Sequence, residues 1–411
     1  MQISETYFPR SEDELAGLVS DAVVKTVPLE VCANRTKSAL GQPIQVGARV
    51  SLREMRGVTL YEPNELVLSA KAGTPLTEIE KLLAESGQEL AFEPCSLERA
   101  LIAEGAATGE PTIGGAIAAN ASGSRRILRG AARDHLIGMR GVNGRGEVIK
   151  SGGRVMKNVT GYDVARAMAG SWGTLAVMSE ITVKVLPKAE ESRTLICLNL
   201  SDESAVSAMC RALGSAYEVS GAIHLQKPFA ERMSMPDVAS LGQSVTALRL
   251  ENFSSSIEYR LGKLHQELKP FGTIYEMDDG RSRAFWADIK RLQFLSGSDW
   301  PLWRITTAPH QGARLVSALA GQMTCRASYD WSGGLIWLEV PPATDASATV
   351  LRRVIAEFQA DALLVRASAA ARASVGVFQP LPEVNMNLIR RLKEAFDPHR
   401  ILNPGRMYPG I

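Results

Sequence analysis

The chain has 411 residues, 45% of them hydrophobic, and its 46 basic and 44 acidic side chains leave a formal net charge of +2. This length suits roughly two to three domains with cores of their own, and a charge so near neutral would draw in neither a nucleic acid nor an anionic membrane. No stretch approaches the roughly 18 consecutive apolar residues of a membrane helix, and the N-terminus carries acids where a secretory signal would be apolar. We therefore expect a cytoplasmic protein with no transmembrane segment and no nucleic-acid partner.

Cysteine and histidine are both few and widely spaced. The five cysteines are odd in number, and no two have the CxxC spacing of metal or iron–sulfur ligands. None of the five histidines stands at metal-ligand spacing from another. We therefore expect no metal site here, and any iron–sulfur chemistry would have to come from another chain.

The first half of the chain alternates short apolar runs with turn signals. Residues 61–73 predict a strand, and Thr74-Pro75 then opens a helix that Gly87 ends. The strand ITVKVLPK ends this pattern, and the character of the sequence changes after it. We therefore expect a domain boundary near residue 188.

A hairpin is predicted within this first half. Residues 135–153, HLIGMRGVNGRGEVIKSGG, contain two apolar runs on either side of Asn143-Gly144. That dipeptide is suited to the positive φ angles of a tight turn, so we expect a positive φ at each of its two residues.

The next part of the chain contains one order of elements twice, strand–helix–strand–strand–helix–strand. Two such units side by side predict one broad antiparallel sheet with helices on one face. A further helix is expected between the units, over 280–295, and residues 386–408 predict an amphipathic helix ended by Asp397-Pro398, followed by a fixed tail. The expected elements are 194–200, 202–214, 219–226, 244–250, 254–268 and 272–276, then 302–307, 311–320, 324–330, 334–340, 346–358 and 361–367.

The segment PTIGGAIAANASG, Pro111–Gly123, is too poor in large side chains to fill a core by itself. One interpretation is a small-residue helix packed tightly against a sheet. A Rossmann dinucleotide loop is a second, but the G-x-G-x-x-G spacing is missing. The third is a loop that lets phosphate oxygens or a flat ring approach the backbone at Gly114 and Gly115. Local chemistry and spacing leave the first and third open.

Three long motifs decide what the segment resembles. They are YEPNELVLSAKAGTPLTEIEKLLAESGQELAFEP, PTIGGAIAANASGSRR and RDHLIGMRGVNGRGEVIKSGGRVMKNVTGYDVARAMAGSWGTLAVMSEITVKVLP. In this order they resemble the FAD-binding domain of the vanillyl-alcohol oxidase type, also called the PCMH type. Within that superfamily the chain is most similar to E subunits of bacterial glycolate oxidase, including its ending RLKEAFDPHRILNPGRMY.

The resemblance implies an α+β fold. A two-subdomain PCMH-type FAD-binding domain would be followed by a ferredoxin-like α+β cap domain with two βαββαβ halves. The implied boundaries are 1–188 for the FAD-binding domain, 189–385 for the cap, and 386–411 for a C-terminal helix and tail that return to the FAD-binding domain.

In that family FAD lies extended between the two subdomains, and loop backbone holds its pyrophosphate. The usual glycine-rich loop after the first strand is replaced here by Ala33-Asn34-Arg35-Thr36-Lys37, whose side chains add charge. Arg406 would return to the cofactor with the tail. The cofactor-binding residues implied by the resemblance are Asn34, Arg35, Thr36, Lys37, Thr112, Gly114, Gly115, Ala116, Asn120, Ser122, Gly123, Gly161, Asp163, Gly170, Gly173, Thr174, Val177 and Asn403.

The resemblance implies an accessory role in oxidising glycolate to glyoxylate. Similar catalytic flavoproteins carry HxGDGN-like and EHG-like motifs, which are absent from this sequence, so no catalytic residue is assigned. The implied partners are a homologous catalytic flavoprotein subunit and an iron–sulfur subunit, with a small 2-hydroxy acid as substrate of the complex. Through that complex the chain would lie at the inner face of the membrane.

Two other functions stay open. One is a self-sufficient FAD-dependent 2-hydroxy-acid dehydrogenase, and the other is a scaffold that has kept the fold and lost the flavin.

Several further side chains are assigned structural roles. Cys95 is interpreted as a buried thiol and not as a covalent flavin anchor. Trp300, Trp303, Trp331 and Trp337 are interpreted as core or interface packing. Arg125, Arg126, Arg129 and Arg133 are interpreted as a solvated face, with contact to a cofactor phosphate or an acidic partner as the alternative.

Overall fold

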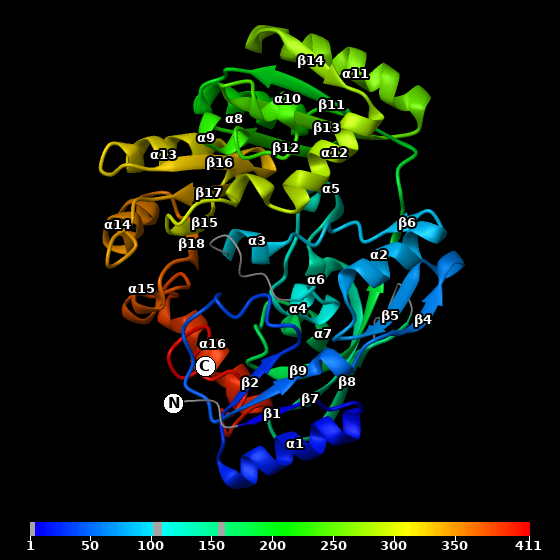
Figure 1. Cartoon of the computed structure of the whole chain (residues 1–411), viewed down its shortest axis with the longest axis vertical. Coiled ribbons are helices and arrows are strands. Elements are labelled where there is room, and N and C mark those ends of the chain that lie inside the picture. Colours follow the sequence, from blue (N-terminus) through cyan, green and yellow to red (C-terminus); the bar gives the residue numbers. More distant parts are fainter. Residues whose placement is uncertain (1–4, 102–108, 155–160) are drawn as a thin grey trace.

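The computed structural model describes residues 5–101, 109–154 and 161–411, and its fold is α+β. Figure 1 shows the first part of the chain in the lower half of the molecule and a layered second part above it, with the C-terminus back among the lower strands. No helix in the described ranges is long and apolar enough to cross a bilayer.

Two sheets build the lower half. Three parallel strands follow the order β1-β3-β2, and five antiparallel strands follow the order β4-β5-β9-β7-β8, with a short pair of β10 and β6 beside them. The strands are β1 (Glu5–Tyr7), β2 (Leu29–Cys32), β3 (Ala48–Ser51), β4 (Val58–Glu62), β5 (Val67–Lys71), β6 (Gln88–Glu89), β7 (Leu136–Asn143), β8 (Val148–Gly152), β9 (Ala176–Lys184) and β10 (Leu186–Pro187). The helices are α1 (Glu12–Lys25), α2 (Leu76–Glu85), α3 (Leu97–Leu101), α4 (Ile113–Ala118), α5 (Arg126–Arg129), α6 (Ala132–His135) and α7 (Val164–Met168).

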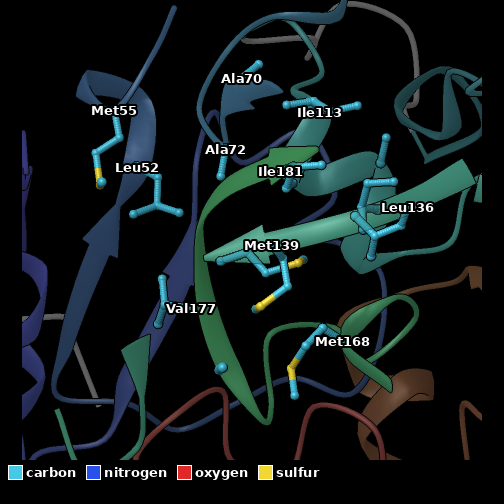
Figure 2. Packing of buried hydrophobic residues seen from close by; sticks show 14 of the residues in the cluster. Leu52, Met55, Ala70, Ala72, Ile113, Leu136, Met139, Met168, Val177 and Ile181 are labelled. Carbon is cyan, nitrogen blue, oxygen red and sulfur yellow. The ribbon is translucent and has the colours of Figure 1, made fainter. Parts of the chain in front are cut away.

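One hydrophobic core joins both lower sheets. Figure 2 shows Ala70 and Ala72 of the β5 end and Ile181 of β9 near Ile113 at the start of α4, with Met139 of β7 lower in the same core. Because β9 is covered on both faces, nearly all of its residues are buried despite their alternating pattern. The core therefore fixes α4 against the end of β5, which positions the segment Pro111–Gly123.

The upper half contains one antiparallel sheet of eight strands in the order β14-β11-β13-β12-β16-β17-β15-β18. The predicted double βαββαβ order and the broad antiparallel sheet are confirmed. The elements are β11 (Glu191–Leu198), α8 (Asp202–Leu213), β12 (Val219–Leu225), α9 (Lys227–Ala230), α10 (Pro236–Ala239), β13 (Val245–Asn252), α11 (Ser254–Leu268), β14 (Ile274–Met277), α12 (Asp279–Lys290), β15 (Leu302–Thr306), α13 (Gly312–Ala320), β16 (Arg326–Asp330), β17 (Leu335–Glu339), α14 (Ala348–Glu357), β18 (Asp361–Arg366), α15 (Ala369–Ser374) and α16 (Glu383–Phe396).

The two faces of this sheet bury different helices. Leu195 and Leu248 face the core that α8, α11, α13 and α14 cover, as predicted for the ferredoxin-like helices. Alternate residues such as Ile196 face a second core with Phe285 of α12 and Ala121 of the lower half. The expectation of helices on one face only is therefore wrong, because α12 covers part of the second face and the lower half covers more of it. We propose dividing the chain into 1–188, 189–385 and 386–411 on this basis, and we call the second unit the cap.

The predicted hairpin of β7 and β8 is present, but its turn differs from the expectation. Within it the positive φ belongs to Gly146, at +80°, and Asn143 Oδ1 accepts a hydrogen bond from the Glu147 amide at 3.1 Å. Gly144 lacks a side chain for another reason, since a Cβ there would collide with the Asp397 carboxylate. The close approach of the C-terminal tail explains this glycine.

The tail is held by a buried ion pair at the end of α16. Lys393 Nζ donates to Asp397 Oδ2 at 2.8 Å, to the Thr174 carbonyl at 2.7 Å and to the Leu402 carbonyl at 3.0 Å. Asp397 accepts the Leu402 amide at 2.9 Å, and Leu29 of β2 bridges to Leu402 in parallel. The tail thus closes over β2 and over the loop that follows it.

Candidate functional site

Two cavities adjoin where the loop after β2, the start of α4 and the cap meet. The smaller, which we call the loop cavity, measures about 90 Å³ and lies between residues 30–38 and α4. The larger, the cap cavity, measures about 430 Å³ and lies between residues 119–127 and strands of the cap. Ala119 and Trp172 line both cavities, so an extended ligand can occupy both.

Three positive side chains line the loop cavity, those of Arg35, Lys37 and Arg406. Arg406 Nη2 donates to the Lys37 carbonyl oxygen at 2.8 Å, and the Lys37 amine lies over α4, where a Cβ built on Gly115 would be 3.7 Å from Nζ. Burial lowers the pKa of Lys37, while the charge of Glu98 opposes that shift. Lys37 and Arg406, with Arg35 at the rim, suit a ligand with two phosphate charges.

The loop Ala33–Lys37 contains one left-handed residue, a position that glycine usually fills. Arg35 has φ +58°, a conformation that costs a non-glycine residue roughly 1–2 kcal/mol. Two hydrogen bonds hold the loop in place: Ser38 Oγ donates to the Arg35 carbonyl at 3.0 Å, and Asn34 Nδ2 donates to the Glu110 carbonyl at 2.8 Å. The exposed Arg35 side chain is thus carried at the rim of the loop cavity.

The start of α4 gives adjacent glycines different roles. Thr112 caps the helix by accepting the Gly115 amide at 3.2 Å. Gly114 donates its amide to the Ala72 carbonyl at 2.9 Å, and a Cβ on Gly114 would lie 2.6 Å from that oxygen. Gly114 therefore serves close packing against the end of β5, while Gly115 lines the loop cavity. Both amides have acceptors within the protein, and the Lys37 amine is a donor that lines the cavity beside Gly115.

Asn403 connects the C-terminal tail to both sides of the loop cavity. Its Oδ1 accepts the Val31 amide at 2.8 Å, and its Nδ2 donates to the Trp172 carbonyl at 2.8 Å. A Cβ on Gly173 would lie 2.9 Å from that Nδ2, so the glycine permits the contact. The tail therefore shapes the loop cavity as well as lining it.

The structure brings together part of the predicted cofactor set. Asn34, Arg35, Thr36, Lys37, Thr112, Gly115 and Asn403 line the loop cavity, and Asn120 and Ser122 line the cap cavity. The others line neither of these two cavities: Gly114, Ala116, Gly123, Gly161, Asp163, Gly170, Gly173, Thr174 and Val177.

Several of the residues outside the cavities have clear structural contacts. Ala116 and Val177 belong to the core, and Thr174 is buried and donates from Oγ1 to the Ser171 carbonyl at 2.7 Å. Asp163 caps α7, and Gly170 has φ +83° in the loop that follows it. Residues 155–160 of the third motif lie outside the described ranges.

Sequence reasoning missed the charge of the cap cavity. Arg304 of β15 and Arg126 of α5 both line it, and both guanidinium groups lie over the indole of Trp331, at 5.2 and 4.7 Å from Cζ to the ring centroid. Trp331 packs at the interface as expected, and its Nε1 donates to the Gly123 carbonyl at 3.0 Å. An arginine inside the apolar strand LWRIT is the signal that could have pointed to this cavity.

Arg125 corrects the expectation of a solvated basic face. Its guanidinium donates to both oxygens of Glu251, at 2.6 and 2.9 Å, and pairs with Glu89 at 2.9 Å. Arg249 donates to both oxygens of Glu93, at 2.8 and 3.0 Å. We call these five residues the ion cluster.

The ion cluster lies between the cap and the lower half, and all five of its residues line a further cavity of about 280 Å³ there. Arg125 is 8% exposed and Arg249 2%. Burial alone would raise the pKa of Glu251, but the charges of Arg249 and Arg125 hold that pKa well below its usual value. Because these charges are mutually satisfied, the ion cluster fixes the position of the cap.

Asp330 is a buried carboxyl group next to the cap cavity. It accepts Ser124 Oγ at 2.6 Å and the Trp331 amide at 2.7 Å. Burial raises its pKa to about 7, above the ordinary 3.8. Cys95 lines the cavity itself, and burial raises the pKa of its thiol to about 11.

Within residues 5–101, 109–154 and 161–411, no three His, Cys, Asp or Glu side chains cluster in a way that could hold a metal ion. Arginine, lysine and amide groups are the polar side chains of the two cavities, together with hydroxyl groups and the Glu30 carboxylate. Such a set of donors suits an anionic organic ligand.

Comparison with known proteins identifies the class. Residues 4–152 match the family described as FAD binding domain, and residues 379–407 match FAD linked oxidases, C-terminal domain. The solved structure of p-cresol methylhydroxylase with substrate bound matches with a TM-score of 0.66 at 13% identity, covering 98% of this chain and 88% of that chain. The chain is therefore an FAD-linked flavoprotein with the PCMH-type fold, and its cofactor is FAD.

Full-length relatives define the family more closely. The chain is 30% identical to glycolate oxidase subunit GlcE of Escherichia coli (strain K12), over 95% of this chain and 95% of the relative. It is 24% identical to glycolate oxidase subunit GlcD of Bacillus subtilis (strain 168), over 97% of this chain and 88% of the relative. The chain belongs to the family of glycolate oxidase subunit GlcE.

Proposed function

We propose that the chain is the FAD-binding subunit of a glycolate oxidase complex that oxidises glycolate to glyoxylate, accessory to a homologous catalytic flavoprotein. The similarity to GlcE along 95% of both chains carries this proposal. The similarity to GlcD over 97% of this chain supports a homologous flavoprotein as the partner. An iron–sulfur subunit completes the proposed complex, which passes electrons toward the quinone pool from the cytoplasmic face of the membrane.

In this proposal FAD extends across the two adjoining cavities, with its pyrophosphate in the loop cavity. Lys37 and Arg406 offset the phosphate charges, and Gly115 leaves room for the phosphates beside Thr112. Trp172, which lines both cavities, borders the passage toward the cap. The bound flavin supplies the electron acceptor. The protein's own residues hold and orient it and keep water away.

Substitution of Lys37 tests this placement of the cofactor. Lys37→Met should weaken FAD binding about 10- to 100-fold, because a charge-assisted contact to phosphate is lost. Lys37→Arg should retain most of the affinity, and Lys81→Met on the exposed face of α2 should retain all of it. Titration of the apoprotein with FAD, followed by flavin fluorescence, measures each affinity. Equal affinity in Lys37→Met and the parent would reject this pyrophosphate site.

Purification of the chain alone and with its partners tests the subunit role. We expect the isolated chain to show flavin absorbance and to lack turnover of glycolate with a dye acceptor, and the assembled complex to turn glycolate over. A colourless chain that still assembles would instead identify a scaffold. Turnover of glycolate or D-lactate by the isolated chain would identify a self-sufficient dehydrogenase.

A further inference from the structure

Arg304, which is half-buried, differs from the buried arginines beside the interface. Arg125 and Arg249 meet the glutamates of the ion cluster, and Arg366 donates to Glu339 at 2.9 Å. Arg304 lies in the middle of β15, flanked by two fully buried apolar residues, yet it forms no ion pair with a carboxylate of the described residues. The strand thus carries its one cation at the wall of a cavity.

A second cation faces the same cavity from the other half of the molecule. Arg126 follows Arg125 at the start of α5, and its guanidinium shares the Trp331 indole with that of Arg304. From the two ring distances, the two Cζ atoms are less than about 10 Å apart. Like charges this close repel each other when water is scarce, so the two guanidinium groups are electrostatically unfavourable neighbours.

The groups around Arg304 leave this charge uncompensated. Burial lowers the pKa of Arg304 to about 10, and the charge of Arg126 acts in the same direction. Of the acidic groups that face it, the Cys95 thiol has a pKa of about 11 and is neutral at pH 7. The Asp330 carboxyl group accepts hydrogen bonds from Ser124 Oγ and from the Trp331 amide. It is not within ion-pair distance of Arg304. A partly desolvated cation without a carboxylate partner costs stability, and such groups are typical of binding sites.

We propose that the cap cavity binds the carboxylate of a small organic acid, paired with the Arg304 guanidinium and with Arg126 as the second cation. The proposal rests on the proposed function and deepens it, because it gives this chain a ligand site of its own. Asn120 and Thr306 add polar groups to the wall, which suits a hydroxyl or second acid oxygen on the ligand. Because one arginine comes from each half, the site is complete only while the cap is docked.

Binding of oxalate to the FAD-loaded, full-length chain tests the site, since oxalate has no C–H bond to oxidise. Calorimetry and the change in flavin absorbance measure the affinity. Arg304→Met should raise Kd about 10- to 100-fold, as expected for loss of a charge-assisted pair. Arg304→Lys should recover part of the affinity, because the charge returns without the bidentate geometry.

Two controls separate the cavity from a general effect of charge. Arg314→Met removes an exposed arginine from α13 and should leave the oxalate affinity unchanged. Glycolamide, the neutral isostere of glycolate, should compete weakly with oxalate, whereas glycolate should compete well. Equal competition by both would reject recognition of a carboxylate.

Two further outcomes would overturn the inference. One is an unchanged oxalate affinity in Arg304→Met with normal FAD content. The other is loss of FAD from Arg304→Met, which would place the arginine against the flavin. The subunit role fails separately: a chain that binds oxalate through Arg304 but is dispensable for glycolate turnover by the complex would keep the site and reject the role.

Discussion

The ion cluster and the cap cavity lie at the same interface between the cap and the lower half. Their arginines differ, because those of the ion cluster pair with carboxylates and those of the cap cavity do not. In the ion cluster, Arg125 and Arg249 each meet glutamate oxygens at hydrogen-bond distance. In the cap cavity, Arg126 and Arg304 share an indole ring and pair with no carboxylate of the described residues. Two successive residues, Arg125 and Arg126, therefore serve different purposes, one fixing the cap and the other facing a cavity.

The two regions differ in whether an arginine has a carboxylate partner, and this difference predicts the effect of removing the arginine. A fully paired arginine contributes to holding two parts together, and removing it leaves its partners charged and buried. An unpaired one costs stability in the absence of a ligand, so removing it costs the fold little. The same substitution, arginine to methionine, should thus lower stability strongly in the ion cluster and change it little in the cap cavity.

Arg125→Met should give the largest effect. It leaves Glu89 without its cation and Glu251 with Arg249 alone, and breaking a buried pair in this way costs about 3–5 kcal/mol of unfolding free energy. Chemical denaturation measures the change. Arg129→Met, on the exposed side of α5, is the matched control and should stay within about 0.5 kcal/mol of the parent. Equal stability of the two variants would remove the ion cluster as the element that fixes the cap.

Asp330→Asn should change the pH dependence of stability. The pKa of Asp330 is about 7 in the folded protein against 3.8 ordinarily, so between these values the folded state keeps a proton that the unfolded chain has lost. Stability should therefore fall as pH rises from about 4 to 7, by at most about 1.4 kcal/mol per pH unit, and level off above 7.

Melting temperatures of the parent and Asp330→Asn across this range measure that contribution. The asparagine variant should show a flatter profile, because it has no proton to lose. The paired Glu251, whose pKa is low, contributes stability that is lost only below its ordinary value of 4.5, so its window does not overlap pH 5–7. Parallel profiles of the two proteins would contradict the raised pKa.

Trp331→Phe should have a smaller effect, about 1–2 kcal/mol. The change removes the hydrogen bond from Nε1 to the Gly123 carbonyl and part of the ring surface that both arginines cover. Urea denaturation measures it. A loss as large as that of Arg125→Met would mean that the aromatic contact, and not the ion cluster, holds the cap.

Arg304→Met should have the smallest effect on stability, within about 0.5 kcal/mol and of either sign. The guanidinium has no carboxylate partner to leave behind, and relief of its desolvation offsets the lost contacts. A thermal unfolding comparison with Arg125→Met, at one pH and without organic acids, gives the contrast directly. If Arg304→Met unfolded as easily as Arg125→Met, the two regions would not differ as we infer.

The fold could largely be read from the sequence, because its signals are local. The alternation of strand and helix patterns located both βαββαβ units of the cap, and Asp397-Pro398 marked the end of α16. Side chains in such elements repeat with a fixed period, so the pattern is visible without the tertiary structure. The FAD cofactor was found in the same way, from long motifs in order.

The candidate site was only partly predictable, because its contacts are long-range. Gly114 and Gly115 look alike in the sequence, and only the approach of Ala72 distinguishes the packing glycine from the one at the cavity. Likewise, the residues next to Arg125 in the sequence do not indicate that Glu251 pairs with it. Which arginine of a basic run is paired depends on a chain segment more than a hundred residues away.

The contact between Leu29 and Leu402 has a consequence for how the protein is made. Asn403 bonds to Val31 across 372 residues of sequence, so the loop cavity is shaped by two segments that are synthesised far apart in time. Contacts of such separation form late, after the intervening cap has been synthesised. The nascent protein would therefore present an open loop cavity until the Asn403 segment is synthesised, and firm retention of the cofactor would follow only then.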